Sequence, residues 1–360
     1  LNIIAFKIIK KEVIIMSRKI TKILLTIFAI PLVIFVLGYL LTMGASVPQT
    51  VEQDPSIPHV TIDGVTFHAE TFGNPENPVV IFVHGGPGDD YRLFLSLKAL
   101  SDEFYVVFYD QRGTGLSPRV NAEELTFDLT VSDLNLIVDH YSHGKKVNLV
   151  GHSFGAMLVA PYLGKYPEKV DHAVLSEPGF LTTETAMKYM AYFASKVSNK
   201  GLNYYFQGIK TWFEILHING PDEQARDDYI YAHAGVSAGN KPRQTEYYCN
   251  GEYATGESVY WRRSALANQS VQNLAGKSEF VSLDANGRPE FHFTKGVENF
   301  NRKVLFIASE CNKIIGEEIQ SIHMQSFPTA ELAVIKGAGH DMFLGKPEEV
   351  VKVIREYLNE

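Results

Sequence analysis

The sequence contains only two cysteines, Cys249 and Cys311, among its 360 residues. Two cysteines cannot build a disulfide framework and their spacing is not that of a zinc site, so we expect a structural role, with pairing to each other as one option. The sequence also lacks a His-Glu-x-x-His motif and a glycine-rich dinucleotide fingerprint. These absences predict a protein that uses no metal and no organic cofactor.

An excess of positive charge is also missing. The formal net charge is −8 and no basic stripe runs along the chain, so nucleic acid is not an expected partner. The sequence shows no internal repeats and no low-complexity tract. Hydrophobic residues make up 45% of the chain and charged residues 21%, which is the composition of a globular protein with a sizeable core.

One long N-terminal stretch has no charge at all. No charged residue occurs between Lys22 and Glu52, and residues 23–41 are almost entirely apolar. Because a bilayer core requires about 20 apolar residues, we predict a transmembrane anchor over residues 23–43. The alternative is a signal peptide that is cleaved to give a secreted protein. The stretch is longer than the roughly 7–15 residues of a signal peptide, and residues 42–46 match a cleavage site poorly, so we favour the anchor.

The residues that flank this stretch predict its orientation. Arg18, Lys19 and Lys22 lie on its N-terminal side. By the positive-inside rule, residues 1–22 are therefore expected in the cytoplasm and the rest of the protein outside it, as a single-pass membrane protein. Met16 precedes the basic run and is a candidate translation start.

Beyond a tether at residues 44–58, strand and helix patterns alternate along the chain. This alternation predicts an α/β fold with a mostly parallel sheet and helices on both faces. The predicted strands are short apolar runs at residues 60–69 (around an Asp-Gly turn), 79–83, 104–109, 147–150, 173–176, 303–308 and 331–335, and a helix is predicted at 347–358. We assign residues 59–179 and 302–360 to the two parts of one core domain.

A Gly-x-Ser-x-Gly motif occupies residues 151–155, directly after the apolar run at 147–150. A buried strand that ends in this motif and runs into a helix is the nucleophile elbow of α/β-hydrolases. The two glycines are needed because a side chain at either position would crowd the neighbouring strand and helix. We therefore predict that Ser153 is the nucleophile of an enzyme.

The strand–helix alternation stops between residues 180 and 301. This segment is rich in aromatic residues and reads as mainly helical. It is inserted between two core strands and begins after the strand that follows the nucleophile helix. We therefore predict a helical cap over the active site.

A serine hydroxyl needs a base that removes its proton. In this fold the order along the chain is serine, acid, histidine, and His340 stands in a glycine-rich loop after the last predicted strand. His340 is thus the predicted base. The predicted oxyanion hole consists of the backbone N–H groups of Phe154, next to the nucleophile, and of Gly86, in the loop after the strand at 79–83.

Two further motifs carry a family resemblance. His-Gly-Gly-Pro-Gly at 84–88 and Asp-Gln-Arg-Gly-Thr-Gly-Leu-Ser at 110–117 resemble the proline iminopeptidase branch of the α/β-hydrolases, and the resemblance covers roughly residues 60–180 and 300–360. It implies that the protein releases an N-terminal residue, often proline, from small peptides. It also implies that carboxylates of the cap bind the free amine, and the candidates are Glu184, Glu214, Glu246, Glu252 and Glu257.

The resemblance breaks down at the triad acid. The family places an aspartate on the loop after the penultimate strand, where this chain has Asn312. An amide can orient an imidazole but cannot offset the charge of an imidazolium. Glu310 lies on the same loop, and Glu177 directly follows the strand after the nucleophile helix, where certain other α/β-hydrolases carry their acid. Our hypothesis is that Glu177 is the acid, with Glu310 and Asn312 as alternatives.

These observations predict a serine hydrolase that acts through an acyl-enzyme on a short peptide or another small molecule, in the manner of a proline iminopeptidase. The alternative is an acyl ester hydrolase of the carboxylesterase or lipase type. Members of the iminopeptidase branch usually carry Gly-Gly-Ser-Trp-Gly at the elbow, whereas this chain has Gly-His-Ser-Phe-Gly, which many esterases share. A third hypothesis is a catalytically impaired binding protein. The sequence does not determine the oligomeric state.

Overall fold

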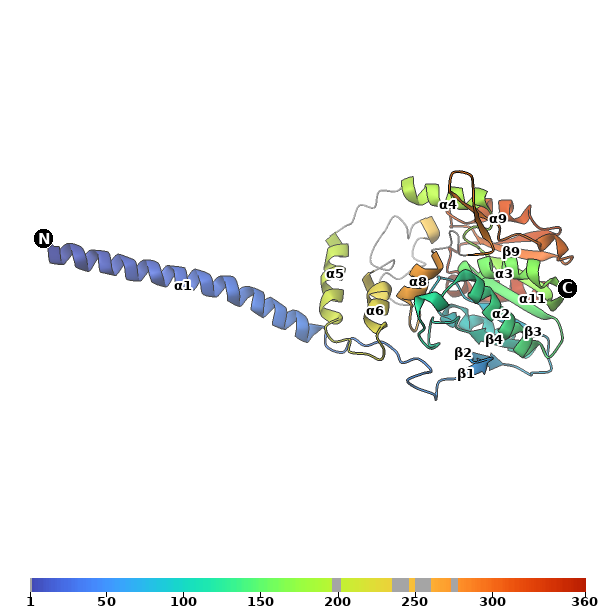
Figure 1. Cartoon of the computed structure of the whole chain (residues 1–360), viewed down its shortest axis with the longest axis horizontal. Helices are drawn as coiled ribbons and strands as arrows, with labels where there is room; N and C mark the ends of the chain where they lie inside the picture. The colour runs from blue at the N-terminus through green and yellow to red at the C-terminus, as the bar shows by residue number, and fades with distance from the viewer. Residues whose placement is uncertain (1, 196–201, 235–245, 250–259, 273–277) are drawn as a thin grey trace.

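A computed structural model describes residues 2–195, 202–234, 246–249, 260–272 and 278–360. One long helix, α1 (Asn2–Leu41), projects from a globular part that contains the rest of the described chain (Figure 1).

An eight-stranded sheet forms the centre of the globular part, with the strand order β1-β2-β4-β3-β5-β6-β9-β10. Only the pairs β1–β2 and β2–β4 are antiparallel, and every other pair is parallel. The predicted mostly parallel sheet is therefore confirmed. The strand bounds are β1 His59–Ile62, β2 Val65–Phe72, β3 Val79–Val83, β4 Tyr105–Tyr109, β5 Val147–His152, β6 Val170–Ser176, β9 Val304–Ser309 and β10 Ala330–Ile335.

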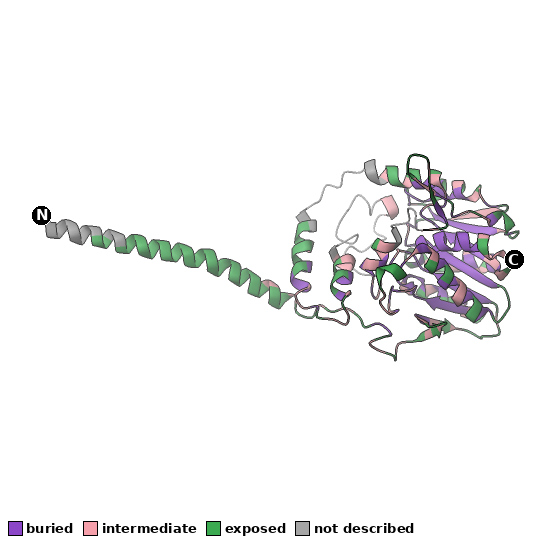
Figure 2. Ribbon diagram, viewed as in Figure 1, coloured by how far each residue is buried: buried purple, intermediate pink, exposed green. Residues whose placement is uncertain are grey.

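Helices cover both faces of this sheet, and Figure 2 shows the strands as the buried centre of the globular part. Successive side chains of a strand point to opposite faces, and β3 illustrates the consequence. Ile81 packs in one core cluster with α2 (Phe127–Ser142) and α3 (Phe154–Lys165). Phe82 packs in the other, with the 3-10 segment η1 and helix α11. The remaining bounds of the core are η1 Tyr91–Asp102, η2 Ala122–Glu124, η3 Pro167–Lys169, α9 Glu317–Met324, α10 Met342–Gly345 and α11 Pro347–Leu358.

The first strand differs from its prediction. Residues 60–69 were expected to form one strand around an Asp-Gly turn, whereas β1 and β2 are two strands of an antiparallel hairpin. Asp63 and Gly64 join them with φ angles of 48° and 83°. Positive φ at both central residues is what a tight hairpin turn requires, and Asp-Gly is a preferred pair for it.

The described part of the insertion between β6 and β9 consists mainly of helices. Among its described residues it also contains a two-stranded hairpin that the sequence analysis did not predict. A short bridge from Thr182 to His292 ties the start of the insertion to the segment after this hairpin. The bounds are α4 Thr183–Ser195, α5 Leu202–Glu214, α6 Ala225–Ala234, α8 Ala265–Gln272, β7 Val281–Leu283, β8 Pro289–Phe291 and η4 Val297–Asn299.

Helix α1 is longer than the predicted span, because it begins at Asn2 instead of near residue 23. Its segment Ile14–Leu41 has a mean hydropathy of 2.7, and no part of it is buried within the protein. The helix is therefore not a core element. Its length and composition suit either a membrane anchor or a signal sequence.

Candidate active site

The Gly-x-Ser-x-Gly motif forms a sharp turn between β5 and α3. Ser153 has a φ of 53° and a ψ of −120°, a backbone conformation that a residue with a side chain seldom adopts. A Cβ on Gly151 would lie 2.7 Å from Cα of Ala156, and one on Gly155 would lie 1.9 Å from the carbonyl oxygen of Val83. Both glycines are thus required by the close approach of strand, turn and helix.

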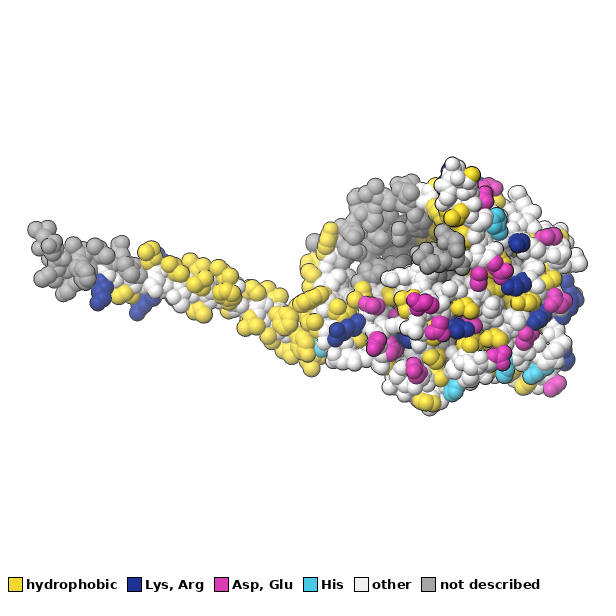
Figure 3. All heavy atoms as spheres, in the orientation of Figure 1, with side chains coloured by type: hydrophobic (Ala, Val, Ile, Leu, Met, Phe, Trp, Pro, Cys, Tyr) yellow, Lys and Arg dark blue, Asp and Glu magenta, His cyan; other side chains and the backbone are white. Residues whose placement is uncertain are grey.

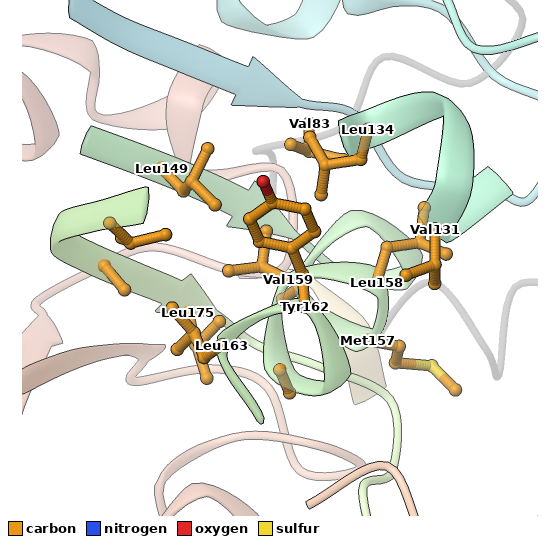
Figure 4. Packing of buried hydrophobic residues seen from close by; sticks show 14 of the residues in the cluster. Val83, Val131, Leu134, Leu149, Met157, Leu158, Val159, Tyr162, Leu163 and Leu175 are labelled. Carbon is orange, nitrogen blue, oxygen red and sulfur yellow. The ribbon is translucent and has the colours of Figure 1, made fainter. Parts of the chain in front are cut away.

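The packing of α3 holds this strained turn in place. Every residue from Phe154 to Leu163 is buried. The side chains of α3 lie between the sheet and α2, so the helix cannot shift without opening the core. Figure 4 shows part of this cluster. The labelled side chains come from α3 (Met157, Leu158, Val159, Tyr162 and Leu163), from the sheet (Val83, Leu149 and Leu175) and from α2 (Val131 and Leu134).

The glycine-rich loop after β3 lies beside the turn. A Cβ on Gly85 would lie 2.9 Å from Cβ of Ser153. Gly86 has a φ of 120°, which favours glycine. Nε2 of His84 accepts the backbone N–H of Gln111 at 3.0 Å, and Nδ1 of His84 lies 2.9 Å from the carbonyl oxygen of Gly85. Both ring nitrogens of His84 are therefore used to brace the loop.

Phe154, the other predicted oxyanion donor, is the first residue of α3. Backbone N–H groups in the first turn of a helix have no partner within the helix. They also lie at the positive end of the helix dipole. This N–H group is thus suited to an oxygen that develops negative charge.

Glu177 and His340 meet although 163 positions separate them in the sequence. Glu177 directly follows β6, and its backbone N–H donates to the carbonyl oxygen of Ile307 at 3.0 Å. Its Oε2 lies 2.7 Å from Nδ1 of His340, and its carboxylate is fully buried. When the carboxylate is ionised, Nδ1 carries the proton and donates, which leaves Nε2 free to accept a proton.

Asn312, at the position where the family has its acid, bonds to Glu177. The amide nitrogen Nδ2 donates to Oε2 of Glu177 at 2.7 Å. The amide oxygen accepts two backbone N–H groups of the following turn at 3.0 and 3.1 Å. The other carboxylate oxygen, Oε1, accepts the backbone N–H and the hydroxyl of Ser309 at 2.7 and 2.6 Å. Glu177 is therefore held by three donors besides the imidazole.

These neighbours set the charge of the histidines. Burial lowers the pKa of His340, but the hydrogen bond and charge of Glu177, with Asp341 and Asp89, outweigh it and raise the pKa above that of an ordinary histidine. The ring of His152 lies 4.5 Å from that of His340. Burial, and then the charge of His340, hold the pKa of His152 well below its usual range.

The sheet brings the predicted residues to one edge. In the register of parallel strands, His152 is paired with Ser176, and Ser309 is paired with Ile335. The carboxyl ends of β5, β6, β9 and β10 therefore lie together, which is where open α/β sheets form their sites. No hydrogen bond joins the Ser153 hydroxyl to His340 in the described part of the chain. Such bonds often tighten only when substrate is present.

The other acid candidate lies elsewhere on the same loop. Glu310 is exposed, and its Oε2 accepts the backbone N–H of Gly337 at 2.8 Å. Its Oε1 lies 3.5 Å from Nζ of Lys336. The imidazole of His340 is bonded to Glu177 and not to Glu310.

Of the predicted amine-binding carboxylates, one lies on a segment that contacts the site. The carbonyl oxygen of Glu246 accepts the backbone N–H of Lys313, and that of Tyr247 accepts the backbone N–H of His340, both at 2.8 Å. The same segment is joined to the acid loop by a disulfide between Cys249 and Cys311. This bond realises one of the roles expected for the two cysteines.

The other carboxylates are placed differently. Glu214, at the end of α5, is buried and pairs with Lys210. Glu184 is exposed and lies 3.5 Å from Lys188. Glu252 and Glu257 are outside the described residues.

A polar clamp that was not predicted from the sequence joins the glycine-rich loop to the insertion. Asp90 accepts the backbone N–H groups of Trp261 and Arg262 at 2.6 and 3.0 Å. The carboxylate of Asp89 accepts a hydrogen bond from Nε of Arg263 at 2.5 Å. The carbonyl oxygen of Gly88 accepts the N–H of Ser264 at 2.7 Å. The signal was present as an Asp-Asp pair directly after the loop and an Arg-Arg pair in the insertion.

A second part of the clamp lies within the insertion. Arg262 donates from Nη1 and Nη2 to the two carboxylate oxygens of Asp222 at 2.7 Å each, and from Nε to Asp228 at 2.8 Å. Arg119 of the core also donates to Asp228, at 3.0 Å. The two ion pairs of Asp228 are buried, so the insertion is fixed to the core at this point. Among the described residues, no group of three or more histidines, cysteines or acidic residues could hold a metal ion.

Comparison with known proteins gives the family of the chain. A profile of the alpha/beta hydrolase fold matches residues 78–347. The chain is 24% identical over 310 residues to proline iminopeptidase PfmaB of Pestalotiopsis fici, covering 83% of this chain and 98% of that protein. It is 22% identical over 302 residues to the proline iminopeptidase of Thermoplasma volcanium, with 83% and 95% covered.

Among solved structures, the proline iminopeptidase of Mycobacterium smegmatis superimposes with a TM-score of 0.57 at 17% sequence identity, covering 84% of this chain and 97% of that one. At this identity the likeness concerns the fold. The profile match over most of the chain shows that the protein belongs to the α/β-hydrolase fold family, and the relatives that it resembles along most of their length include proline iminopeptidases.

Proposed function

We propose that the protein is a serine hydrolase in which Ser153, His340 and Glu177 form the catalytic triad. The observation that carries the proposal is the 2.7 Å contact between Oε2 of Glu177 and Nδ1 of His340, with the carboxylate fully buried at the end of the sheet where Ser153 follows β5. The contact leaves Nε2 of the imidazole to act as the base, which is the arrangement a serine nucleophile needs.

The mechanism follows from these roles. Nε2 of His340 takes the proton of the Ser153 hydroxyl, whose oxygen attacks the substrate carbonyl. The resulting oxyanion accepts hydrogen bonds from the N–H groups of Phe154 and Gly86. The imidazolium then gives its proton to the leaving group, and an acyl-enzyme remains. A water molecule, deprotonated by the same imidazole, releases the acid and restores the hydroxyl.

Asn312 has a supporting part in this scheme. Its amide donates to Glu177, and its own oxygen is tied to two backbone N–H groups, so the carboxylate has one orientation toward the ring. We therefore assign Asn312 as a positioning residue and Glu177 as the acid.

The substrate that we propose is a short peptide with a free N-terminus, as the names of the relatives suggest. Residues 180–301 would act as the cap. Within them Glu246 is the best amine ligand among the described candidates, because its neighbour Tyr247 bonds the backbone of His340 and its own carbonyl bonds the acid loop. A carboxylate there would offset the charge of the amine.

Turnover of two substrates and labelling by a covalent probe test this function. A prolyl anilide with a free amine should be hydrolysed much faster than the same anilide with its amine blocked, and Ser153→Ala should abolish both reactions. A fluorophosphonate probe should label the protein but not the Ser153→Ala variant. A folded protein that the probe fails to label would contradict the triad and favour a binding role.

An acyl ester hydrolase is the second candidate, because the elbow reads Gly-His-Ser-Phe-Gly. This activity would use the same triad but would need no amine ligand. Hydrolysis of short acyl esters that exceeds that of the free prolyl anilide, with no effect of Glu246→Gln on either, would favour it over the peptidase.

We also propose that α1 is a membrane anchor and is not cleaved, with its N-terminus in the cytoplasm. Its apolar run at residues 23–41 exceeds the length of a signal peptide core, and the basic residues Arg18, Lys19 and Lys22 precede that run. The chain should remain in the membrane pellet after extraction with alkaline carbonate, and a protease added from the cytoplasmic side should leave the globular part intact.

A further inference from the structure

Helix α5 turns its apolar face away from the protein. Phe206, Ile209 and Trp212 recur at spacings of three residues on one face, and they are 61%, 56% and 48% exposed. Thr211 and Glu214, on the opposite face, are buried. A surface helix of a water-soluble protein shows the reverse arrangement. Something other than water is therefore expected to cover the outer face.

The same face of α5 is continuous with the apolar surface of α1. The ring centroid of Phe35 lies 6.2 Å from that of Trp212 and 5.8 Å from that of Phe213. The ring of Tyr39 lies 4.2 Å from that of His217, just after α5. Figure 3 shows hydrophobic side chains along α1 and on the adjoining end of the globular part. Whatever surrounds α1 thus also meets α5.

These contacts fix the level of α5 along α1. Phe35 precedes the last residue of α1, Leu41, by six residues, or about 9 Å of helix. Apolar faces of helices that lie on a membrane sink roughly 5–10 Å below the headgroup boundary. Nε2 of His217 lies 3.0 Å from the carbonyl oxygen of Tyr39 and 3.2 Å from Oγ1 of Thr42, so polar groups begin where the apolar surface of α1 ends.

We propose that α5 lies on the extracytoplasmic surface of the bilayer that α1 crosses, with Phe206, Ile209 and Trp212 inserted among the lipids. The proposal rests on the proposed anchor and is independent of the hydrolase chemistry. Aromatic residues are enriched at the boundary between lipid and water. Lys210, ion-paired with Glu214 and half-exposed at the rim of this face, can extend its ammonium toward lipid phosphates. The insertion between β6 and β9 is thereby held against the membrane.

The two tryptophans of the chain allow a direct test. The full chain is reconstituted in phosphatidylcholine nanodiscs, with and without brominated lipid. Trp261→Phe leaves Trp212 as the sole reporter, and Trp212→Phe leaves Trp261, which packs against Tyr91. Bromine should quench the emission of Trp212 about twofold or more, because an interfacial side chain lies within roughly 10 Å of the acyl chains. It should leave the emission of Trp261 unchanged.

A second pair of variants tests the same proposal independently, in case the tryptophan variants misfold. A nitroxide is attached at Ile209→Cys on α5, or at Leu283→Cys on β7, which is similarly exposed at 51%. The label at 209 should be more accessible to oxygen than to a water-soluble nickel complex, and the label at 283 should show the opposite. Similar accessibility at the two positions would overturn the proposal.

The remaining outcomes distinguish a failure of this proposal from a failure of the proposal that α1 is a membrane anchor. A chain that resists carbonate extraction but shows no quenching of Trp212 keeps the anchor and overturns the role of α5. A dimer in the nanodisc with Trp212 unquenched would mean that a second copy covers the face, which also overturns it. A chain that carbonate releases into the soluble fraction overturns both.

Discussion

The sheet edge and the insertion that spans residues 180–301 are held in different ways. Ser153, Glu177 and His340 follow strand ends or the loop after β10, and each backbone is bonded to a neighbouring segment, as in the bond from the N–H of Ser153 to the carbonyl oxygen of Ser176 at 2.8 Å. The described contacts of the insertion instead include a few buried ion pairs, such as that of Arg262 with Asp228, and one disulfide.

We relate this difference to two proposed roles: the sheet holds the reacting groups, and the insertion binds the substrate. Backbone bonds between strands depend little on which side chains are present, so the reacting groups keep their positions when the sequence diverges. The clamp of the insertion depends on particular charged side chains, Arg262 among them, so this part of the protein can diverge more readily in shape. The predictions below test that division.

The largest expected effect concerns the edge of the sheet. Glu177→Gln should lower kcat by about 10³–10⁴-fold, because an amide cannot stabilise the imidazolium and favours the wrong tautomer. Glu310→Gln is the matched control on the neighbouring loop, and its kcat should stay close to that of the parent protein. Steady-state turnover of a prolyl anilide or an acyl ester measures both. Equal losses in the two variants would contradict the assignment of the acid.

The next effect concerns the attachment of the insertion. Arg262→Met should lower the free energy of unfolding by about 3–5 kcal/mol, because it removes the bidentate partner of Asp222 and one of the two arginines that pair with the buried Asp228. Arg288→Met removes an exposed pair with Asp284 and should cost less than about 1 kcal/mol. Denaturant unfolding of the full chain in detergent measures both. A loss in Arg262→Met no larger than in the control would show that the clamp is not what holds the insertion.

A smaller effect is expected at Asn312. Asn312→Ala should lower kcat about tenfold, because a hydrogen bond to a charged group contributes about 1.5 kcal/mol or more. In a Glu177→Gln background, Asn312→Asp should restore part of the lost turnover, since it returns a carboxylate to the loop where the family has one. An Asn312→Ala variant with parental kcat and an unchanged pH profile would mean that the amide is not a positioning residue.

The smallest effect is a shift of the pH profile. The base must be neutral to take a proton, so kcat/KM should fall as the pH drops below the pKa of His340. Glu177 contributes to raising this pKa, so the acid limb should lie above that of an ordinary histidine. In Glu177→Gln the effect of burial, which lowers the pKa of His340, is opposed less strongly. The acid limb of the kcat/KM profile should therefore move to lower pH. A limb that stays in place in this variant would exclude His340 as the titrating group.

Much of the fold could be predicted because it depends on local patterns. The apolar runs at 79–83 and 147–150 form β3 and β5, and the elbow glycines mark where β5 meets α3. The hairpin β7–β8 was not predicted, because strands of three residues carry almost no periodic signal. The clamp at Asp90 was missed because its partners are 171 and 172 positions away.

The strand and helix alternation, the strained turn at Ser153 and the long apolar helix are encoded locally, because each follows from the size and polarity of residues that are neighbours along the chain. The sequence left three candidates for the acid. Only the tertiary structure brought Glu177 against His340, because strand order and register decide which loops meet at the edge of a sheet. The catalytic role of that contact stays a prediction. The outward face of α5 was likewise decided by tertiary packing, since an amphipathic pattern gives the two faces of a helix but not the direction in which they point.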